Sequence, residues 1–220
     1  MKKLLITLAA IVCLAGVRAQ KFHNAYYDTR IAAHQLEGLA PNAIIFLGNS
    51  ITEQGWWQVL IPGRKVENRG IGGDNTYGML DRLPDILKSN PRKIFLMAGI
   101  NDLTAGRPVD EIAANIAKIS EMVHAACPDC RIYIQSVLPV NDARLAYPAI
   151  KGKNPQVKEL NARLEALCAQ TPWATYVDLW PLFSDGEGQL RLELTKDGIH
   201  LHPAAYQMWV KHLKKQKLLK

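Results

Sequence analysis

Cysteine is scarce in this sequence, and its placement argues against several kinds of site. The four residues are Cys13, Cys127, Cys130 and Cys168. Cys127 and Cys130 have the spacing of a redox or zinc pair, but they follow a predicted helix instead of opening one, and no second pair accompanies them. No metal site is therefore expected. The pair is interpreted either as a local disulfide or as two buried thiols, and Cys168, on an apolar helical face, as part of the core.

Signatures of other large classes are also missing. The chain has no internal repeat, low-complexity segment or linker that would divide it. Its net charge is +7, and part of this charge lies in a lysine-rich tail over 211–220, with which no aromatic residues are interleaved. The tail is therefore interpreted as the solvated end of a last helix, and no nucleic-acid partner is expected.

The glycine-rich stretches lack the motifs of nucleotide binding. The run 70–73 has neither the Lys-Ser/Thr of a phosphate loop nor full dinucleotide spacing, so no cofactor is expected. The run 48–52 lacks the second glycine of the G-x-S-x-G elbow. No run of bulky apolar residues near these stretches suggests a lipase lid.

The first 19 residues form a pattern of their own. Lys2 and Lys3 precede an almost unbroken apolar stretch over 4–15, and Val17-Arg18-Ala19 is a small-x-small exit. This pattern predicts a secretory signal peptide over 1–19, cleaved after Ala19, and an exported mature domain over 20–220. The alternative is an uncleaved anchor, for which the apolar stretch is short. No integral membrane segment is expected after cleavage.

The mature chain alternates between strand and helix patterns. Buried-strand patterns lie at 43–47, 65–69, 93–98, 131–137 and 174–179, and helical patterns lie at 22–39, 51–60, 76–87, 109–126, 156–169 and from 204 onward. Strands separated by helices predict a parallel sheet covered on both faces. The predicted fold is an α/β, three-layer α/β/α sandwich with a five-stranded parallel sheet.

The strand at 43–47 delivers Ser50 to the edge of the sheet where α/β proteins keep their ligand sites. A serine hydroxyl needs a base and a third group that orients the base. Asp197 and His200 lie three residues apart, so that one turn carries both. Ser50 N–H, Gly73 N–H and the Asn101 side-chain amide are candidate donors to an oxyanion. Alone, Ser50 would be read as a helix cap.

Four blocks of the sequence resemble those of the SGNH (GDSL-type) hydrolases, in the same order and spacing. The blocks are Gly48-Asn49-Ser50, Gly73-Asp74, Gly99-Ile100-Asn101-Asp102 and Asp197-Gly198-Ile199-His200. The resemblance covers essentially the whole mature chain and implies a flavodoxin-like sandwich. The runs 68–76 and 197–201 are most similar to the platelet-activating-factor acetylhydrolase-like branch, many exported bacterial members of which act on acetylated sugars.

The resemblance implies a role for each matching residue. Ser50 becomes the nucleophile, His200 the base and Asp197 its orienting group, while Ser50 N–H, Gly73 N–H and Asn101 form the oxyanion hole. Asn49 stands where the family usually has aspartate, and a structural role is expected for it.

Other residues remain open from the sequence alone. Asp74 is either a loop brace or a pocket group, and His202 either caps the last helix or lines the pocket. Of Trp56 and Trp57, at least one belongs to the core and the other can form a substrate wall, for which Trp57 is the candidate. The loop over 140–155 is expected to influence substrate choice.

The sequence thus predicts a secreted serine esterase that removes short acyl groups, acetyl above all, from carbohydrate. The first alternative is a phospholipid-type acylhydrolase or lysophospholipase. The second, from a different class, is a carbohydrate-binding protein that keeps the fold without turnover. The acyl-bearing substrate and the oligomeric state are not indicated.

Overall fold

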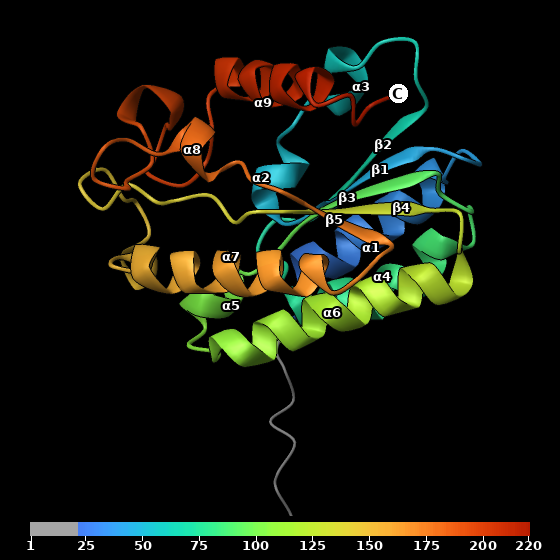
Figure 1. Ribbon diagram of the computed structural model, residues 1–220, viewed down its shortest axis with the longest axis horizontal. Coiled ribbons are helices and arrows are strands. Elements are labelled where there is room, and N and C mark those ends of the chain that lie inside the picture. The colour runs from blue at the N-terminus through green and yellow to red at the C-terminus, as the bar shows by residue number, and fades with distance from the viewer. Residues whose placement is uncertain (1–21) are drawn as a thin grey trace, which may run out of the picture.

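Five parallel strands form one sheet in the order β2-β1-β3-β4-β5 (Figure 1). The computed structural model describes residues 22–220, so the predicted signal peptide over 1–19 lies outside the described residues. The strands are β1 (Ile44–Gly48), β2 (Val66–Gly70), β3 (Lys93–Met97), β4 (Arg131–Gln135) and β5 (Ala174–Val177). This strand order is the flavodoxin-like one, with its switch point between β1 and β3.

The strands form because short apolar runs can be buried on both faces of a parallel sheet. All five residues of β1 and of β3 are buried. The ring of Phe46 in β1 stacks on Phe95 of β3, with 4.9 Å between ring centroids, and on Trp57, with 3.9 Å between ring centroids. The centre of the core is therefore aromatic and lies directly behind the end of β1.

Helices cover both faces of the sheet, as predicted. Figure 1 shows α1, α4, α5, α6 and α7 below the sheet and α3 and α9 above it. The helices are α1 (Ala25–Glu37), α2 (Ser50–Glu53), α3 (Trp57–Leu60), α4 (Thr76–Leu87), α5 (Ile100–Thr104), α6 (Val109–Ala126), α7 (Asn154–Ala169), α8 (Trp180–Phe183) and α9 (Pro203–Lys215), with short 3-10 turns η1 (Pro148–Ile150) and η2 (Leu192–Leu194). The three-layer sandwich expected from the pattern is confirmed.

Two details of the sequence prediction need correction. The helix expected over 51–60 is two short helices, α2 and α3, separated by a turn at Gly55. The ring of Trp57 packs against this glycine, where a Cβ would lie only 2.3 Å from the ring. The helical spacing of the sequence puts Ile31, Ala32 and Leu36 on one apolar face, but the buried residues of α1 are Tyr27 and His34, and Leu36 is 90% exposed.

The cysteine alternatives are also resolved. Cys127 and Cys130 are free, buried thiols, and burial raises the pKa of Cys130 to about 12. Cys168 is half-buried against the core. Within residues 22–220, no helix is long and apolar enough to cross a membrane.

Candidate active site

Ser50 lies at the carboxyl end of β1, as the first residue of α2. Asn49 is the N-cap of this helix: its side-chain oxygen accepts the N–H of Ile51 at 3.0 Å, and the residue is 1% exposed. A carboxylate is not needed for this bond, because a side-chain amide oxygen caps a helix equally well. Asn49 is therefore structural, and the half-buried Ser50 hydroxyl is held at the edge of the sheet.

Asp197 and His200 meet Ser50 from the segment that precedes α9. His200 Nε2 is 2.9 Å from Ser50 Oγ, and His200 Nδ1 is 2.7 Å from Asp197 Oδ2. The other carboxylate oxygen of Asp197 accepts the backbone N–H groups of His200 at 2.7 Å and of Ile199 at 3.1 Å. With a proton on Nδ1, the imidazole presents its Nε2 lone pair to the serine hydroxyl.

These contacts set the charge of Asp197. Partial burial by itself would raise its pKa, but the hydrogen bond from His200 and the two backbone N–H donors outweigh burial and hold the pKa below its ordinary value. The carboxylate is therefore ionised throughout the neutral range and can stabilise a positively charged His200.

The loop after β4 fixes the turn that carries this pair. Gly198 has φ +88°, and a Cβ there would lie 2.8 Å from the carbonyl oxygen of Asn141. Asn141 N–H donates to Gly198 O at 2.8 Å, and Ala146 N–H donates to Asp197 O at 2.9 Å. Tyr147 from the same loop stands edge-on to His200, with 5.7 Å between ring centroids, and is 49% exposed. The sequence placed Tyr147 in a loop and gave no sign of this contact.

The three predicted oxyanion donors belong to neighbouring strand ends. Ser50 follows β1, Gly73 follows β2 and Asn101 follows β3, and β1 lies between the other two in the sheet. Gly73 is exposed with φ +76° and open space around it. Among the hydrogen bonds of residues 22–220, none uses the N–H of Ser50 or Gly73. Asn101 donates to Asp74 O at 2.7 Å, which leaves its second amide hydrogen for a ligand.

Two candidate substrate contacts are wrong. Trp57 is fully buried, and its Nε1 donates to Thr52 O at 2.8 Å, so it belongs to the core. Asp74 is 2% exposed and forms an ion pair with Arg82, so it is a loop brace. Burial raises the pKa of Asp74 to about 6, although the nearby Arg82 charge and the Asn75 N–H act in the opposite direction.

Trp56 and His202 are both accessible and share one hollow of the surface. Trp56 is 59% exposed. Together with the third candidate contact, the half-buried His202, it lines an open hollow of about 270 Å³ beside Gln54 and Lys196. The backbone N–H of Gln54 donates to Ser50 O, and that of Lys196 donates to His200 O, both at 3.0 Å. The His202 side chain makes no capping bond to α9.

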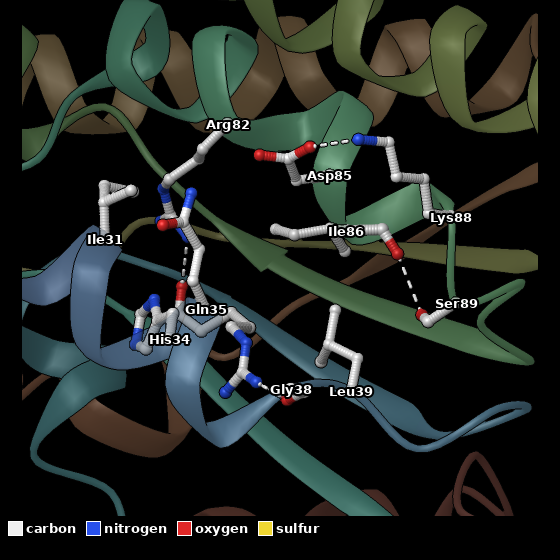
Figure 2. Close-up of a pocket in the computed structure, with 11 residues that line it drawn as sticks. Ile31, His34, Gln35, Gly38, Leu39, Arg82, Asp85, Ile86, Lys88 and Ser89 are labelled. Atoms are coloured by element: carbon white, nitrogen blue, oxygen red, sulfur yellow. Dashed lines mark hydrogen bonds and ion pairs between the residues drawn. The ribbon is translucent and has the colours of Figure 1, made fainter.

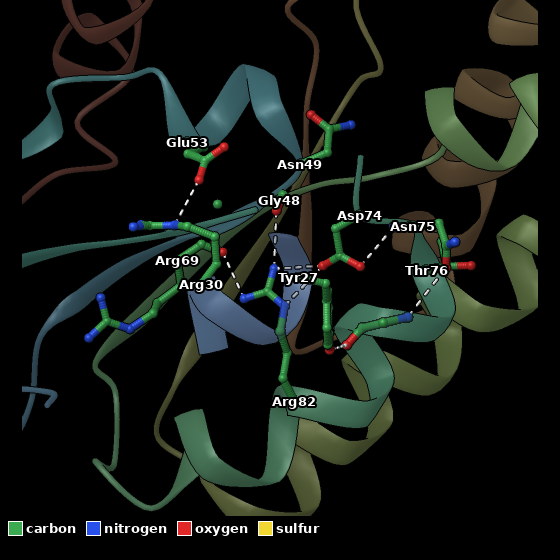
Figure 3. Close-up of polar contacts among 12 residues, drawn as sticks. Tyr27, Arg30, Gly48, Asn49, Glu53, Arg69, Asp74, Asn75, Thr76 and Arg82 are labelled. Atoms are coloured by element: carbon green, nitrogen blue, oxygen red, sulfur yellow. Dashed lines mark hydrogen bonds and ion pairs between the residues drawn. The ribbon is translucent and has the colours of Figure 1, made fainter. Parts of the chain in front are cut away.

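Arg82 is a site-supporting residue that the sequence reasoning missed. Its Nε donates to Asp74 Oδ2 at 3.0 Å, and its terminal nitrogens donate to Arg69 O at 2.8 Å and Gly48 O at 3.1 Å (Figure 3). The only signal in the sequence was a charged residue among the apolar positions of a helix, beside Leu83.

A second hollow, of about 340 Å³, lies between α1 and α4 (Figure 2). His34, Arg69, Arg82, Ile86 and Ser89 are among its walls. Burial, together with the nearby charges of Arg69, Arg82 and Arg30, lowers the pKa of His34 to about 3. Within residues 22–220, no group of three or more His, Cys, Asp or Glu side chains is placed to hold a metal ion.

Comparison with known proteins gives a consistent family. The sequence model of the GDSL-like Lipase/Acylhydrolase family matches residues 46–208. Human platelet-activating factor acetylhydrolase IB subunit alpha1 is 27% identical over 170 residues, which cover 74% of this chain and 70% of that protein. The range 46–208 matched by the family model contains Ser50, Gly73, Asn101, Asp197 and His200.

Two further similarities differ in extent. N-acylneuraminate cytidylyltransferase of Streptococcus agalactiae serotype III (strain NEM316) is 26% identical over 179 residues, which cover 77% of this chain but 39% of that protein. The chain thus spans well under half the length of this relative. A solved structure of a candidate platelet activating factor protein from Streptococcus pneumonia has a TM-score of 0.76 at 29% identity and covers 89% of this chain and 91% of its own.

Proposed function

The chain belongs to the GDSL-like lipase/acylhydrolase family, and from this premise we propose that it is a serine-dependent carboxylic ester hydrolase. The observation that carries the proposal is the unbroken line of hydrogen bonds from Asp197 through His200 to Ser50. This arrangement activates a serine hydroxyl, which has little nucleophilicity of its own at neutral pH.

Acylation begins with attack of Ser50 Oγ on the ester carbonyl while His200 Nε2 accepts the hydroxyl proton. Asp197 keeps the imidazole in the right tautomer and stabilises its positive charge. The carbonyl oxygen becomes an oxyanion, which accepts hydrogen bonds from Ser50 N–H, Gly73 N–H and the free amide hydrogen of Asn101. Collapse breaks the bond to the alcohol, which leaves with the proton from His200, and the acyl group remains on Ser50.

Deacylation repeats these steps with water. His200 takes a proton from the water as it attacks the acyl carbonyl, and returns the proton to Ser50 Oγ when the acid departs. Each residue ends in its starting protonation state, so the cycle consumes one ester and one water and yields one alcohol and one acid.

We propose a short acyl group, acetyl above all, carried by a carbohydrate. The acetylhydrolase name of the human relative supports the acyl part. The open hollow lined by Trp56 and His202 supports the alcohol part, because exposed Trp56 offers a flat aromatic surface and the bonded pair of Lys196 and Gln54 offers polar groups. The N-acyl sugar in the name of the streptococcal relative is consistent with a sugar substrate.

A phospholipid-type acylhydrolase is the second candidate, favoured by the platelet-activating-factor names of two of the proteins compared. A carbohydrate-binding protein without turnover is disfavoured by the intact bonding of Ser50 to His200. We also propose export, based on the signal-peptide pattern over 1–19. Expression in a bacterial host should then give a mature chain that begins at Gln20, as read by N-terminal sequencing.

The test of the proposal is hydrolysis of p-nitrophenyl acetate and octanoate, and of an acetylated glycan, by the wild-type protein and Ser50→Ala. We expect the acetate to be cleaved faster than the octanoate, and Ser50→Ala to lose covalent labelling by a fluorophosphonate together with the activity. Full activity in Ser50→Ala would exclude the mechanism, whereas faster turnover of the octanoate would favour the lipid candidate.

A further inference from the structure

We propose that Arg82 positions the oxyanion hole by holding together the strand ends that carry its three donors. The inference rests on the proposed function, because it concerns the donors to the oxyanion. Arg82 touches neither Ser50 nor His200 in any contact described above. It is therefore a positioning residue, whose effect on the rate passes through other groups.

The contacts of the guanidinium reach two strand ends at once. Gly48, whose carbonyl oxygen accepts from Arg82, is the last residue of β1 and lies two residues before Ser50. The Arg69 carbonyl, which accepts from the same guanidinium, lies next to the last residue of β2. The Arg82 side chain is only 4% exposed, so these bonds form away from water, where they are strongest.

Asp74 extends the connection to the other two donors. Its carboxylate accepts from Arg82 and from Asn75 N–H at 2.8 Å, while its backbone carbonyl accepts the amide of Asn101 at 2.7 Å. Gly73 is its chain neighbour. A single guanidinium thus joins Gly48, two residues from the Ser50 N–H, to the loop of the Gly73 N–H, and that loop in turn to Asn101.

Helix α4 is shaped to allow this contact. A Cβ at position 78 would lie 2.0 Å from Asp74 Oδ1, so the carboxylate can pack against the helix only because residue 78 is glycine. The Tyr27 hydroxyl donates to the Gly78 carbonyl at 3.0 Å and holds α1 against the same turn. Figure 3 shows Tyr27, Asp74 and Arg82 converging at this point.

Removal of the guanidinium would leave Asp74 as a buried carboxylate without its ion-pair partner. Such a group either takes up a proton or moves toward water, and in both cases the loop of Gly73 loses the ion pair that anchors it. Donors that are slightly misplaced lose most of their effect on the transition state. Lysine is a poor replacement, because one ammonium cannot reproduce the planar fork that reaches a carboxylate and two carbonyls.

Arg69 provides a matched control. Its side chain is equally buried at 3% exposure and lines the same hollow as Arg82. The Arg69 guanidinium donates to the carboxylate of Glu37, the last residue of α1, at 3.1 Å, and to the carbonyl of Gly38, the residue after it. Its side chain therefore supports α1, whereas that of Arg82 supports the donor loops. Loss of either should reduce stability, but only loss of Arg82 should reduce the rate of the chemical step.

The experiment measures kcat and KM for p-nitrophenyl acetate in wild type, Arg82→Ala, Arg82→Lys and Arg69→Ala. Because removing one oxyanion donor costs about 10²–10³ in kcat, we expect a comparable loss in Arg82→Ala with KM within about 3-fold. Arg82→Lys should lie between this variant and wild type. Millimolar guanidinium, entering through the adjacent hollow, should restore part of kcat in Arg82→Ala, and urea should not.

A kcat for Arg82→Ala close to that of wild type would overturn the inference. So would an equal loss in Arg69→Ala, or a loss that guanidinium does not reverse in protein shown by near-UV circular dichroism to be folded. If Arg82→Ala does not fold, the same comparison is made with Arg82→Lys, for which an unchanged kcat is the contrary result. Full activity in Ser50→Ala would instead reject the proposed function, so the two failures are distinguishable.

Discussion

At the scale of single residues, the position of His200 between two oxygen atoms decides its chemistry. Asp197 binds Nδ1 at 2.7 Å and Ser50 lies 2.9 Å from Nε2, so each nitrogen has one task. Only with Asp197 ionised is the Nδ1 proton held in place. Because the pKa of Asp197 is lower in the folded protein than in the unfolded chain, its carboxylate stabilises the folded site above its ordinary titration range. This contribution is lost only as the pH falls through the lowered pKa of the folded state.

Asp197→Asn should therefore abolish most of the activity while leaving the fold intact. By comparison with other Ser-His-Asp enzymes, kcat should fall about 10⁴-fold, because the amide can stabilise the wrong tautomer. Steady-state assays with p-nitrophenyl acetate give the value. Asp129→Asn, an exposed site in the turn before β4, is the control and should behave like wild type. A loss of less than tenfold in Asp197→Asn would remove this residue from the proposed mechanism.

His34 makes a separate prediction about pH and stability. The unfolded imidazole takes up a proton near its ordinary pKa of 6.5, whereas the folded one does so only near 3. The free energy of unfolding should therefore decrease as the pH falls from 6.5 towards 3, because the unfolded state binds more protons in this range. Arg30, which lies 3.2 Å from His34 Nε2, donates to the neutral ring and fits this assignment.

His34→Gln should lose this part of the pH dependence. In urea unfolding at pH 7, 6, 5 and 4, the stability difference between wild type and His34→Gln should shrink toward acid. Ser89→Ala, at the wall of the same hollow, introduces no titrating change and should keep the wild-type slope. Parallel curves for wild type and His34→Gln would contradict the assignment.

At the scale of elements, adjacent tryptophans separate core from surface. Trp57 begins α3, is fully buried and stacks on Phe46, whereas Trp56 is 59% exposed. Trp57→Ala should lower the free energy of unfolding by about 3–5 kcal/mol, the usual cost of deleting a large buried ring. Trp56→Ala should change it by less than about 0.5 kcal/mol. Urea unfolding of both variants provides the comparison, and equal shifts would refute the placement.

The turn before α9 depends on Gly198 in a similar way. Gly198 and Gly63 both have positive φ, at +88° and +74°, but only Gly198 lacks room for a Cβ, because Asn141 O and Leu145 Cα would each lie 2.8 Å away. Gly63→Ala should cost about 1–2 kcal/mol from backbone strain and keep its activity. Gly198→Ala should lose most of its kcat as well, because the loop from 141 to 147 must move from Asp197 and His200. Wild-type kcat in Gly198→Ala would contradict this.

At the scale of the whole molecule, stability comes from the packed sheet and helices without cross-links among the described residues. The three cysteines within residues 22–220 are free, and burial raises the pKa of each thiol. Dithiothreitol should therefore leave Tm unchanged. Ellman's reagent should count three thiols in denatured mature protein, with slow reaction in the native state. A fall in Tm on reduction would reveal a disulfide that the structure lacks.

The sequence by itself determined the order of strands and helices, since continuous apolar runs and helical apolar stripes depend only on neighbouring residues. The helical spacing of Ile112, Ile116, Ile119 and Val123 predicts an apolar stripe, and all four side chains are buried in α6. The sequence also indicated Ser50, Asp197 and His200, because each lies within a short motif.

Only the tertiary structure decided which of two neighbouring residues faces inward. Trp57 rather than Trp56 enters the core, where its ring occupies the space that a Cβ on residue 55 would fill. Asp74 is a brace because its carboxylate packs against Gly78 and accepts from Arg82 of the same helix. Such contacts join residues whose partners are set by packing across elements, which local periodicity does not encode. The contact between Ser50 and His200, which are 150 residues apart in the chain, is likewise made only by the tertiary structure.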